Sequence, residues 1–319
     1  FGQSISLSSD GNIVAIGAPL NDDNGSYSGH VRIFENISGT WTQIGQDIDG
    51  ESSLTSSGWS VSSSGDGSTV GIGGWLNTNN NGIESGHVRI YAFNGNIWNQ
   101  IGQDIDGAAA YDYFGQSVSI NNDGQRIAIG GKGNDGGSNN AGHVRIYEYD
   151  GSAWVKLGQD IYGEGAGDMS GWRVSLSDDG NTVAIGSEYN DDAGNNSGHV
   201  RVYNWNGTSW NKLGNDIDGE AASDMAACVT ISGNGTRIAI GAPYNNDGGT
   251  DAGHVRIFEW NGANWNNLGQ NINGTASDDW FGHALSLNID GTKLAVGAKN
   301  NDDNGNNAGQ VRIFENISG

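Results

Sequence analysis

The segment "NDDNGSYSGHVRIFENISG", residues 21–39, returns as "NDDNGNNAGQVRIFENISG" at residues 301–319. A search for further copies finds equivalent starts at six places: "FGQSISL" at residue 1, "SGWSVSS" at 57, "FGQSVSI" at 114, "SGWRVSL" at 170, "MAACVTI" at 225 and "FGHALSL" at 281. They divide the chain into repeats at 1–56, 57–113, 114–169, 170–224, 225–280 and 281–319. A fixed period of this length predicts a repeat architecture.

Every complete repeat has the same internal order of segments. An alternating segment such as "FGQSISL" precedes a turn such as "SDGN", an apolar run such as "IVAIG", a long polar loop, "GHVRIF", a tight turn and "WTQIGQDIDG". Short alternating or apolar runs between turns rich in Gly, Asn and Asp are typical of strands. We therefore predict four short strands in each complete repeat, the fourth running from Trp41 to Ile48 in the first.

The second strand of each repeat needs cover on both faces, because residues such as those at 13–16 are all apolar. Four-stranded sheets that stack one on the next form a β-propeller. The sequence thus predicts an all-β fold, a six-bladed β-propeller of four-stranded repeats that forms a single domain over residues 1–319. A β-solenoid is the alternative, and it is disfavoured because a repeat of 55 to 57 residues accommodates a whole blade.

The sixth repeat stops after its third strand, so a fourth strand is missing. Three explanations are open: the natural chain extends beyond either end, the sixth blade has three strands, or a neighbouring subunit donates the fourth. The last would build filaments, because head-to-tail strand donation need not close into a ring. The chain also opens at Phe1 without Met or a signal-like segment, which indicates a processed or excised piece.

The motifs "FGQSIS", "AIGAP" at 15–19 and 239–243, and "GHVRIF" resemble the FG-GAP repeats of integrin α-subunit propellers and of secreted microbial and algal proteins. The resemblance runs through all six repeats. It implies an extracellular propeller used in adhesion or assembly, often with calcium. The family's calcium loop has a D-x-D-x-D-G pattern, whereas the corresponding turns here read "SDGN", "GDGS" or "DDGN", so that site is not carried over.

The charge balance restricts the partners. Acidic residues outnumber basic ones by 37 to 14, which gives a net charge of -23 and disfavours nucleic acid and anionic membrane surfaces. Cations, amines or neutral polymers are more natural ligands, although high solubility alone would also explain the charge. The single cysteine, Cys228, excludes an internal disulfide, and we interpret it as a small buried residue.

Long acidic loops are predicted to gather on one face of the disc. The acids concerned are Asp22, Asp23, Asp49, Glu51, Asp106, Asp191, Asp192, Asp218, Glu220, Asp302 and Asp303. Clustered carboxylates are calcium ligands, and the predicted ligands are Asp22, Asp23, Asp191, Asp192, Asp302 and Asp303. The alternative is that these residues cap the backbone of their own loops as Asx turns.

One histidine recurs in five repeats, as His30, His87, His143, His199 and His254, with Gln310 in the sixth. Shared metal ligation is disfavoured because equivalent residues of different blades do not meet. The predicted pairing of third and fourth strands instead places an acid 17 residues later beside four of these histidines, as in His30 with Asp47 and His199 with Asp216. We interpret them as structural His–Asp pairs.

Tryptophan recurs on the outer strand, as Trp41, Trp98, Trp154, Trp210 and Trp265. Blade packing is the plainer interpretation, and stacking on sugar rings would make the protein a multivalent lectin. The residues that break the repeat pattern are Trp75, Lys132, Arg173, Glu188, His283 and Lys299. They suggest no reaction, so the sequence predicts a protein that is not an enzyme.

Seven N-x-S/T sequons are glycosylation candidates: Asn24, Asn36, Asn195, Asn206, Asn234, Asn273 and Asn316. The function predicted from the sequence is an extracellular adhesion or surface-assembly module, with other copies of itself, surface proteins or glycans as partners and calcium as the cofactor. A carbohydrate-binding lectin is the alternative.

Overall fold

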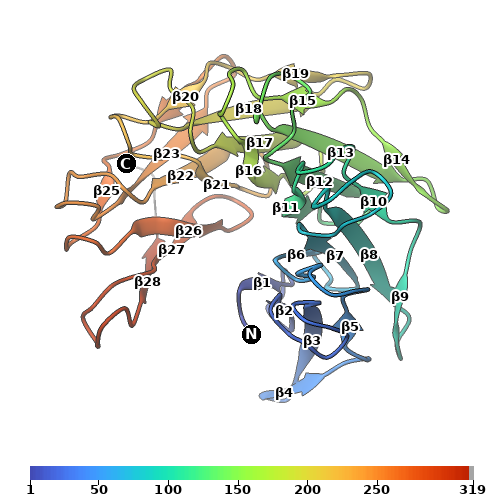
Figure 1. Ribbon diagram of the computed structural model, residues 1–319. Coiled ribbons are helices and arrows are strands. Elements are labelled where there is room, and N and C mark those ends of the chain that lie inside the picture. The colour runs from blue at the N-terminus through green and yellow to red at the C-terminus, as the bar shows by residue number, and fades with distance from the viewer. Residues whose placement is uncertain (316–319) are drawn as a thin grey trace. The chain divides into compact units, whose positions relative to one another are not determined.

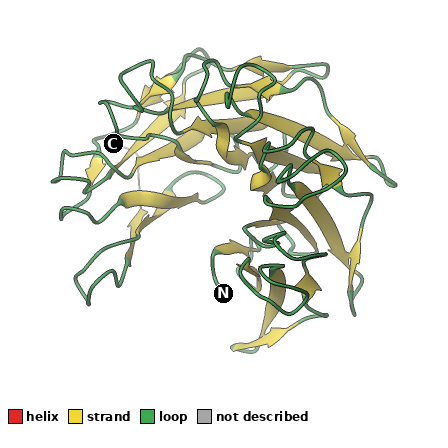
Figure 2. Cartoon of the chain, in the orientation of Figure 1, coloured by secondary structure: helices red, strands yellow, loops and turns green. Residues whose placement is uncertain are grey.

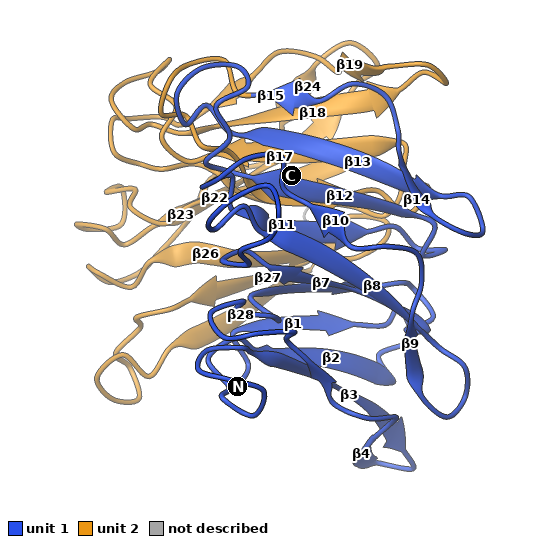
Figure 3. Ribbon diagram, turned by 45° about the vertical axis from the view of Figure 1, so that its right-hand side comes forward, with its two compact units in different colours: residues 1–162 blue, residues 163–319 orange. Residues whose placement is uncertain are grey.

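The computed structural model describes residues 1–315, which consist of strands and loops without a helix (Figure 2). The chain divides into two compact units, residues 1–162 and residues 163–319 (Figure 3). Each unit contains three antiparallel sheets in chain order (Figure 1).

The first unit contains three five-stranded sheets. The first sheet contains β1 (Ser4–Leu7), β2 (Ile13–Ala18), β3 (His30–Ile37), β4 (Thr40–Gln43) and β5 (Ile48–Asp49). The second contains β6 (Ser60–Ser63), β7 (Thr69–Gly74), β8 (His87–Phe93), β9 (Trp98–Gln100) and β10 (Ile105–Asp106). The third contains β11 (Phe114–Ile120), β12 (Arg126–Gly131), β13 (His143–Tyr149), β14 (Trp154–Lys156) and β15 (Ile161–Tyr162).

The second unit contains two five-stranded sheets and one three-stranded sheet. The fourth sheet contains β16 (Ser170–Leu176), β17 (Thr182–Ser187), β18 (His199–Trp205), β19 (Trp210–Lys212) and β20 (Ile217–Asp218). The fifth contains β21 (Cys228–Ile231), β22 (Arg237–Ala242), β23 (His254–Trp260), β24 (Trp265–Asn267) and β25 (Ile272–Asn273). The sixth contains β26 (Phe281–Leu287), β27 (Lys293–Ala298) and β28 (Gln310–Glu315).

These sheets are the six blades of a β-propeller fold, and the predicted fold class is confirmed. The turns between first and second strands close as predicted. In the first blade the Asp10 carboxylate accepts hydrogen bonds from the Ser8 hydroxyl at 2.7 Å and the Asn12 amide at 3.0 Å. These bonds lower the pKa of Asp10 to about 2.

The prediction of one continuous fourth strand is wrong. That strand is split into two short pieces, β4 and β5 in the first blade, and both pair with β3. Between them Gly45 has a φ of +72°, and the Gln46 side chain leaves the blade to bond both backbone groups of Trp98, at 2.7 and 3.0 Å. The interruption shifts the strand register by two residues, so His30 pairs with Asp49 instead of Asp47.

The core lies between consecutive sheets. Val31 and Ile33 of the first blade pack with Val61, Val70 and Ile72 of the second in one buried cluster. The inner ends of the blades approach closely where the repeated glycines stand. A Cβ added at Gly17 would lie 2.1 Å from the Gly58 carbonyl oxygen, which explains the glycine of "AIG".

Two apolar sheet faces stay uncovered within their own units. Ile5 and Leu7 of β1 are 63% and 55% exposed, whereas their equivalents Val118 and Ile120 in the third blade are 9% and 7% exposed. Val311 and Ile313 of β28 are 69% and 71% exposed. The equivalents of these two in the fifth blade, Val255 and Ile257, are 0% and 3% exposed.

Candidate metal centres

The recurring histidine is the first residue of the third strand in five blades, and all five side chains are buried. Burial lowers the pKa of each histidine, and the arginine two residues along the chain lowers it further. The pKa falls to about 4 for His87 and His199. Each imidazole is therefore neutral at pH 7 and keeps a nitrogen lone pair that can bind a metal.

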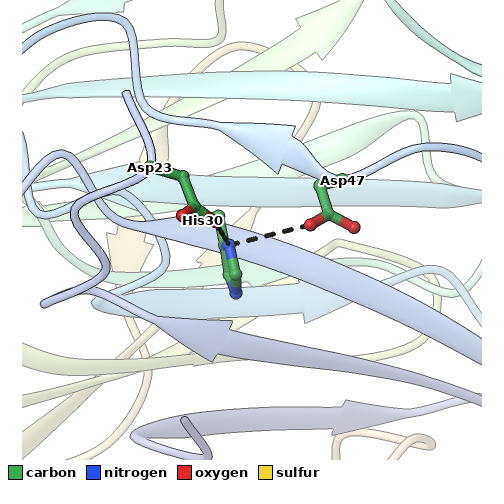
Figure 4. Close-up of side chains that lie close together, drawn as sticks. All are labelled: Asp23, His30 and Asp47. Carbon is green, nitrogen blue, oxygen red and sulfur yellow. Dashed lines mark ion pairs between the residues drawn. The ribbon is translucent and has the colours of Figure 1, made fainter. Parts of the chain in front are cut away.

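In the first blade, two carboxylates lie beside the same nitrogen of His30 (Figure 4). The His30 Nδ1 atom lies 3.8 Å from Asp23 Oδ2 and 3.9 Å from Asp47 Oδ2. Asp23 comes from the long loop before β3, and Asp47 from the interruption between β4 and β5. Both distances are too long for a hydrogen bond, but they suit a cation placed between the three atoms.

Three other blades gather an equivalent group of one histidine and two acids. Its ligand atoms lie within 4.8 Å of one another in the clusters Asp23–His30–Asp47, Glu51–His87–Asp104, Glu164–His199–Asp216 and Glu220–Asp247–His254. In the last three clusters one acid is a glutamate from the end of the preceding repeat. It follows the first aspartate of "QDIDGE", or of the equivalent segment, by four residues. We call these four groups the blade clusters.

Among residues 1–315, buried histidine nitrogens without a hydrogen-bond partner occur in three of the blade clusters, and also at His143, whose blade has no cluster. The Nδ1 atoms of His30, His199 and His254 are buried and have no hydrogen-bond partner among the described residues. A buried polar atom without a partner costs free energy, about 1–3 kcal/mol for a neutral group. A metal ion between imidazole and carboxylates would satisfy these nitrogens and neutralise the acids.

Arginines compete for the same carboxylates. In the first blade Arg32 donates to Asp47 Oδ2 from Nε at 2.9 Å and from Nη2 at 2.7 Å, which lowers the pKa of Asp47. In the second, Arg89 Nη1 lies 3.6 Å from Glu51 Oε1. In the clusters of the first, second and fifth blades, one arginine beside two acids leaves excess negative charge, which favours a divalent cation. In the fourth blade both acids are paired, Glu164 with Arg201 at 3.4 Å and Asp216 with Lys212 at 2.6 Å.

In two blades residues 1–315 contain no such cluster, and other contacts replace it. In the third, the residue at the position of Glu51 is Ala108, and the Tyr162 ring lies 6.2 Å from the His143 ring. There Asp160 is bonded by Arg145 and Lys156, at 2.8 and 2.6 Å. In the sixth, Gln310 replaces histidine, and its Nε2 atom donates to Asp303 Oδ2 at 3.0 Å.

The structure separates the predicted calcium ligands into two kinds. The first aspartate of each pair caps its own loop: Asp22, Asp191 and Asp302 accept backbone amides five residues ahead, at 2.7, 2.7 and 2.6 Å. The second aspartate points toward the recurring position, as Asp23 and Asp192 do toward His30 and His199. The Asx-turn interpretation is therefore confirmed for the first aspartate of each pair, and calcium ligation by the second aspartate stays a prediction.

The predicted His–Asp pairs are close in space but are not hydrogen-bonded. His87 Nδ1 lies 3.9 Å from the predicted Asp104 and also 3.9 Å from Glu51. The sequence argument against metal ligation considered only histidines of different blades. It missed that each histidine can meet acids of its own blade and of the preceding repeat. The recurrence of Glu51, Glu164 and Glu220 at one position of the repeat could have indicated these acids.

The outer tryptophans pack between blades. Trp98, Trp154 and Trp265 are buried, and their Nε1 atoms donate to backbone carbonyls of the preceding blade at 2.9 to 3.0 Å. Trp210 is equally buried, while Trp41 is exposed. The packing interpretation is confirmed for the four buried rings, which cannot stack on a sugar. Cys228 is buried as predicted, and burial raises the pKa of its thiol to about 11.

The sequons are positioned unequally. Asn24, Asn195, Asn206, Asn234 and Asn273 are exposed, and Asn36 is half-buried. The Nδ2 atom of Asn24, which a glycan would occupy, donates to the Gly50 carbonyl at 2.7 Å. Asn316 lies outside the described residues, and glycosylation stays a prediction.

The model of the FG-GAP repeat family matches residues 1–34, 105–147, 163–203 and 273–314, together half of the chain. The chain belongs to the FG-GAP repeat family. The resemblance predicted from the sequence motifs is thereby confirmed. No curated protein matches this FG-GAP chain, and none of its described residues forms a helix that could span a bilayer.

Solved structures share the fold of this FG-GAP protein at low sequence identity. Kuenenia stuttgartiensis hydrazine synthase is similar over 93% of this chain and 74% of its own, with 15% identity and a TM-score of 0.58. The Pseudomonas aeruginosa periplasmic gluconolactonase PpgL is similar over 99% and 88%, with 14% identity and a TM-score of 0.60. A Bacteroides fragilis protein named as a candidate 6-phosphogluconolactonase is similar over 98% and 80%, with 12% identity and a TM-score of 0.62.

These matches overturn one sequence prediction. The FG-GAP chain was predicted not to be an enzyme, yet propellers that share its fold carry enzyme names. The prediction is therefore wrong, because proteins with the same propeller fold include enzymes.

Proposed function

We propose that this FG-GAP protein is an extracellular module that binds divalent cations at its blade clusters and acts in adhesion or surface assembly. The observation that carries the proposal is the buried histidine nitrogen without a partner, repeated in three blades beside two carboxylates. Family membership and the net charge of -23 support an extracellular, cation-rich setting.

The donor set selects the class of cation. Calcium takes oxygen ligands almost exclusively, whereas imidazole suits zinc and other transition metals. One imidazole and two carboxylates therefore favour Zn²⁺ or Mn²⁺ at the blade clusters over the calcium predicted from the aspartates. Calcium fits the sixth blade better, where Asp302 and Asp303 stand without histidine.

Metal stoichiometry tests the proposal. The purified protein is stripped with EDTA, titrated with Zn²⁺, Mn²⁺ or Ca²⁺ by calorimetry, and analysed for bound metal after desalting. We expect up to four Zn²⁺ per chain, and one fewer after His199→Gln. His143→Gln is the matched control because the third blade lacks a cluster, so its stoichiometry should equal that of the wild type. Absence of retained metal, or equal stoichiometry for both variants, would contradict the proposal.

A second candidate function, assembly of filaments from copies of the chain, is favoured by the uncovered sheet faces. Val311 and Ile313 occupy the positions that, in other blades, the next blade covers. Ile5 and Leu7 occupy the positions that face a preceding blade, so the first blade of a second copy offers the surface complementary to β28.

Sedimentation velocity over a wide concentration range tests assembly. We expect association that grows with concentration and is lost in the double variant Val311→Lys and Ile313→Lys. Val155→Lys is the control, since Val155 is an exposed apolar residue on a different strand. A monomer at every concentration would contradict this second function without affecting the cation proposal.

A further inference from the structure

Residues that break the repeat pattern come together in the second unit. Arg173 lies on β16, Cys228 on β21 and His283 on β26, which are the first strands of three consecutive blades. Arg173 pairs with Gly186 of the second strand. In the other five blades, the residue that pairs with the equivalent glycine is small: Ser4, Ser60, Ser117, Cys228 and Ala284. A large cation at such a position is not required by the fold.

The contacts join these strands. Cys228 Sγ donates to the His283 carbonyl oxygen at 3.3 Å, and the charge of Arg173 acts on the Cys228 thiol. The His283 ring stacks on Trp280, with ring centres 6.4 Å apart and planes inclined by 19°. Trp280 also packs against Tyr244 at 5.0 Å, and Lys299 Nζ lies 5.5 Å from the centre of a Trp280 ring. We call Arg173, Tyr244, Trp280, His283 and Lys299 the mixed cluster.

Its charge is opposite to that of the molecule. Ten of the 14 Lys and Arg side chains pair with carboxylates in the described structure, whereas Arg173 and Lys299 have no ion pair among residues 1–315. Burial, together with these same two cations, lowers the pKa of His283 to about 4. The acids that act on residues of this region are the buried Glu188, which acts on Cys228 and Tyr244, and the half-buried Asp251, which acts on Tyr244.

The mixed cluster is accessible to a ligand. Arg173, Tyr244, Trp280 and His283 are half-buried and Lys299 is exposed. A guanidinium recognises carboxylates by paired hydrogen bonds, and an ammonium adds a second charge. A tryptophan ring offers a flat apolar surface, which suits the C–H face of a pyranose.

We propose that the mixed cluster binds a carboxylated sugar of the uronic acid class. Arg173 and Lys299 hold the carboxylate, and Trp280 packs against the sugar ring. The surrounding negative charge of the chain disfavours long polyanions, so a short or terminal uronate is the ligand that fits. This site is separate from the blade clusters, whose histidines belong to the third strands.

Calorimetric titration with digalacturonate, in buffer with EDTA to exclude cation bridging, tests the proposal. We expect Arg173→Gln and Lys299→Met each to weaken binding at least tenfold. Lys293→Met is the matched control, because Lys293 on the same hairpin pairs with Glu315 at 3.1 Å, and it should bind like the wild type. Thermal melting confirms that each variant is folded, and the exposed Lys299 keeps the test valid if the Arg173 variant is not.

Neutral galactobiose and acetate separate the two parts of the proposal. We expect the wild-type protein to bind digalacturonate at least tenfold more tightly than either probe. Equal affinity for acetate would overturn the sugar assignment, and equal affinity for galactobiose would overturn the role of the cations. Absence of digalacturonate binding at millimolar concentration would overturn the site itself.

Discussion

His143 allows the cost of a buried neutral histidine to be measured apart from any metal. Its side chain is fully buried, neither ring nitrogen has a hydrogen-bond partner among the described residues, and the third blade lacks a cluster. Burial lowers its pKa from 6.5 to about 3, with a further contribution from Arg145. The unfolded chain therefore takes up a proton between pH 7 and pH 5, and the folded protein does not.

The sign and size of the effect follow from linkage. Below pH 6.5 the unfolded state binds more protons, so the free energy of unfolding falls as the pH falls, until the folded histidine is protonated near pH 3. With these two pKa values, His143 should remove about 2 kcal/mol of stability between pH 7 and pH 5. Asp160, whose pKa is lowered by Arg145 and Lys156 against the opposing effect of burial, stays ionised over this range.

The assay is urea unfolding of the wild type and of His143→Gln at pH 7 and pH 5, with EDTA present. Glutamine is a natural choice because the sixth blade carries Gln310 at this position. The other histidines contribute equally to both proteins, so the variant should lose about 2 kcal/mol less than the wild type on acidification. If both proteins lose the same free energy, His143 is not buried as a neutral group and the reasoning is refuted.

Three further predictions follow from packing and ligation. Gly17→Ala should destabilise the protein by about 1–3 kcal/mol in urea unfolding, because the added Cβ would lie 2.1 Å from the Gly58 carbonyl oxygen. Gly297→Ala, at the equivalent position in the sixth blade but with its nearest atom 3.4 Å away, should cost less. Trp154→Phe should cost about 1 kcal/mol through the lost hydrogen bond to Ile101, and an unchanged unfolding midpoint would contradict that role. Zn²⁺ at 100 times its dissociation constant should stabilise the protein by about 2.7 kcal/mol per independent site. The measurement is a rise in melting temperature, which EDTA should reverse and His199→Gln should reduce.

The sequence determined the repeats, the order of their strands and the packing role of the outer tryptophans. These features are local or recur at a fixed period, so one repeat read against another is sufficient to find them. The alternation in "FGQSISL" and the apolar run "IVAIG" each encode a strand by themselves. The loop-capping role of Asp22 was also readable, because an Asx residue bonds backbone a few residues away.

Contacts between side chains of consecutive blades could not be predicted from the sequence. The two-residue shift between β4 and β5 arises because Gln46 bonds the next blade, an interaction that spacing within one repeat does not contain. Glu51 reaches His87 for the same reason, since sheet stacking, and not strand pairing, brings the two repeats together. The mixed cluster is the furthest case: Arg173 and His283 are 110 positions apart in the sequence, and their proximity depends on the intervening blade that carries Cys228.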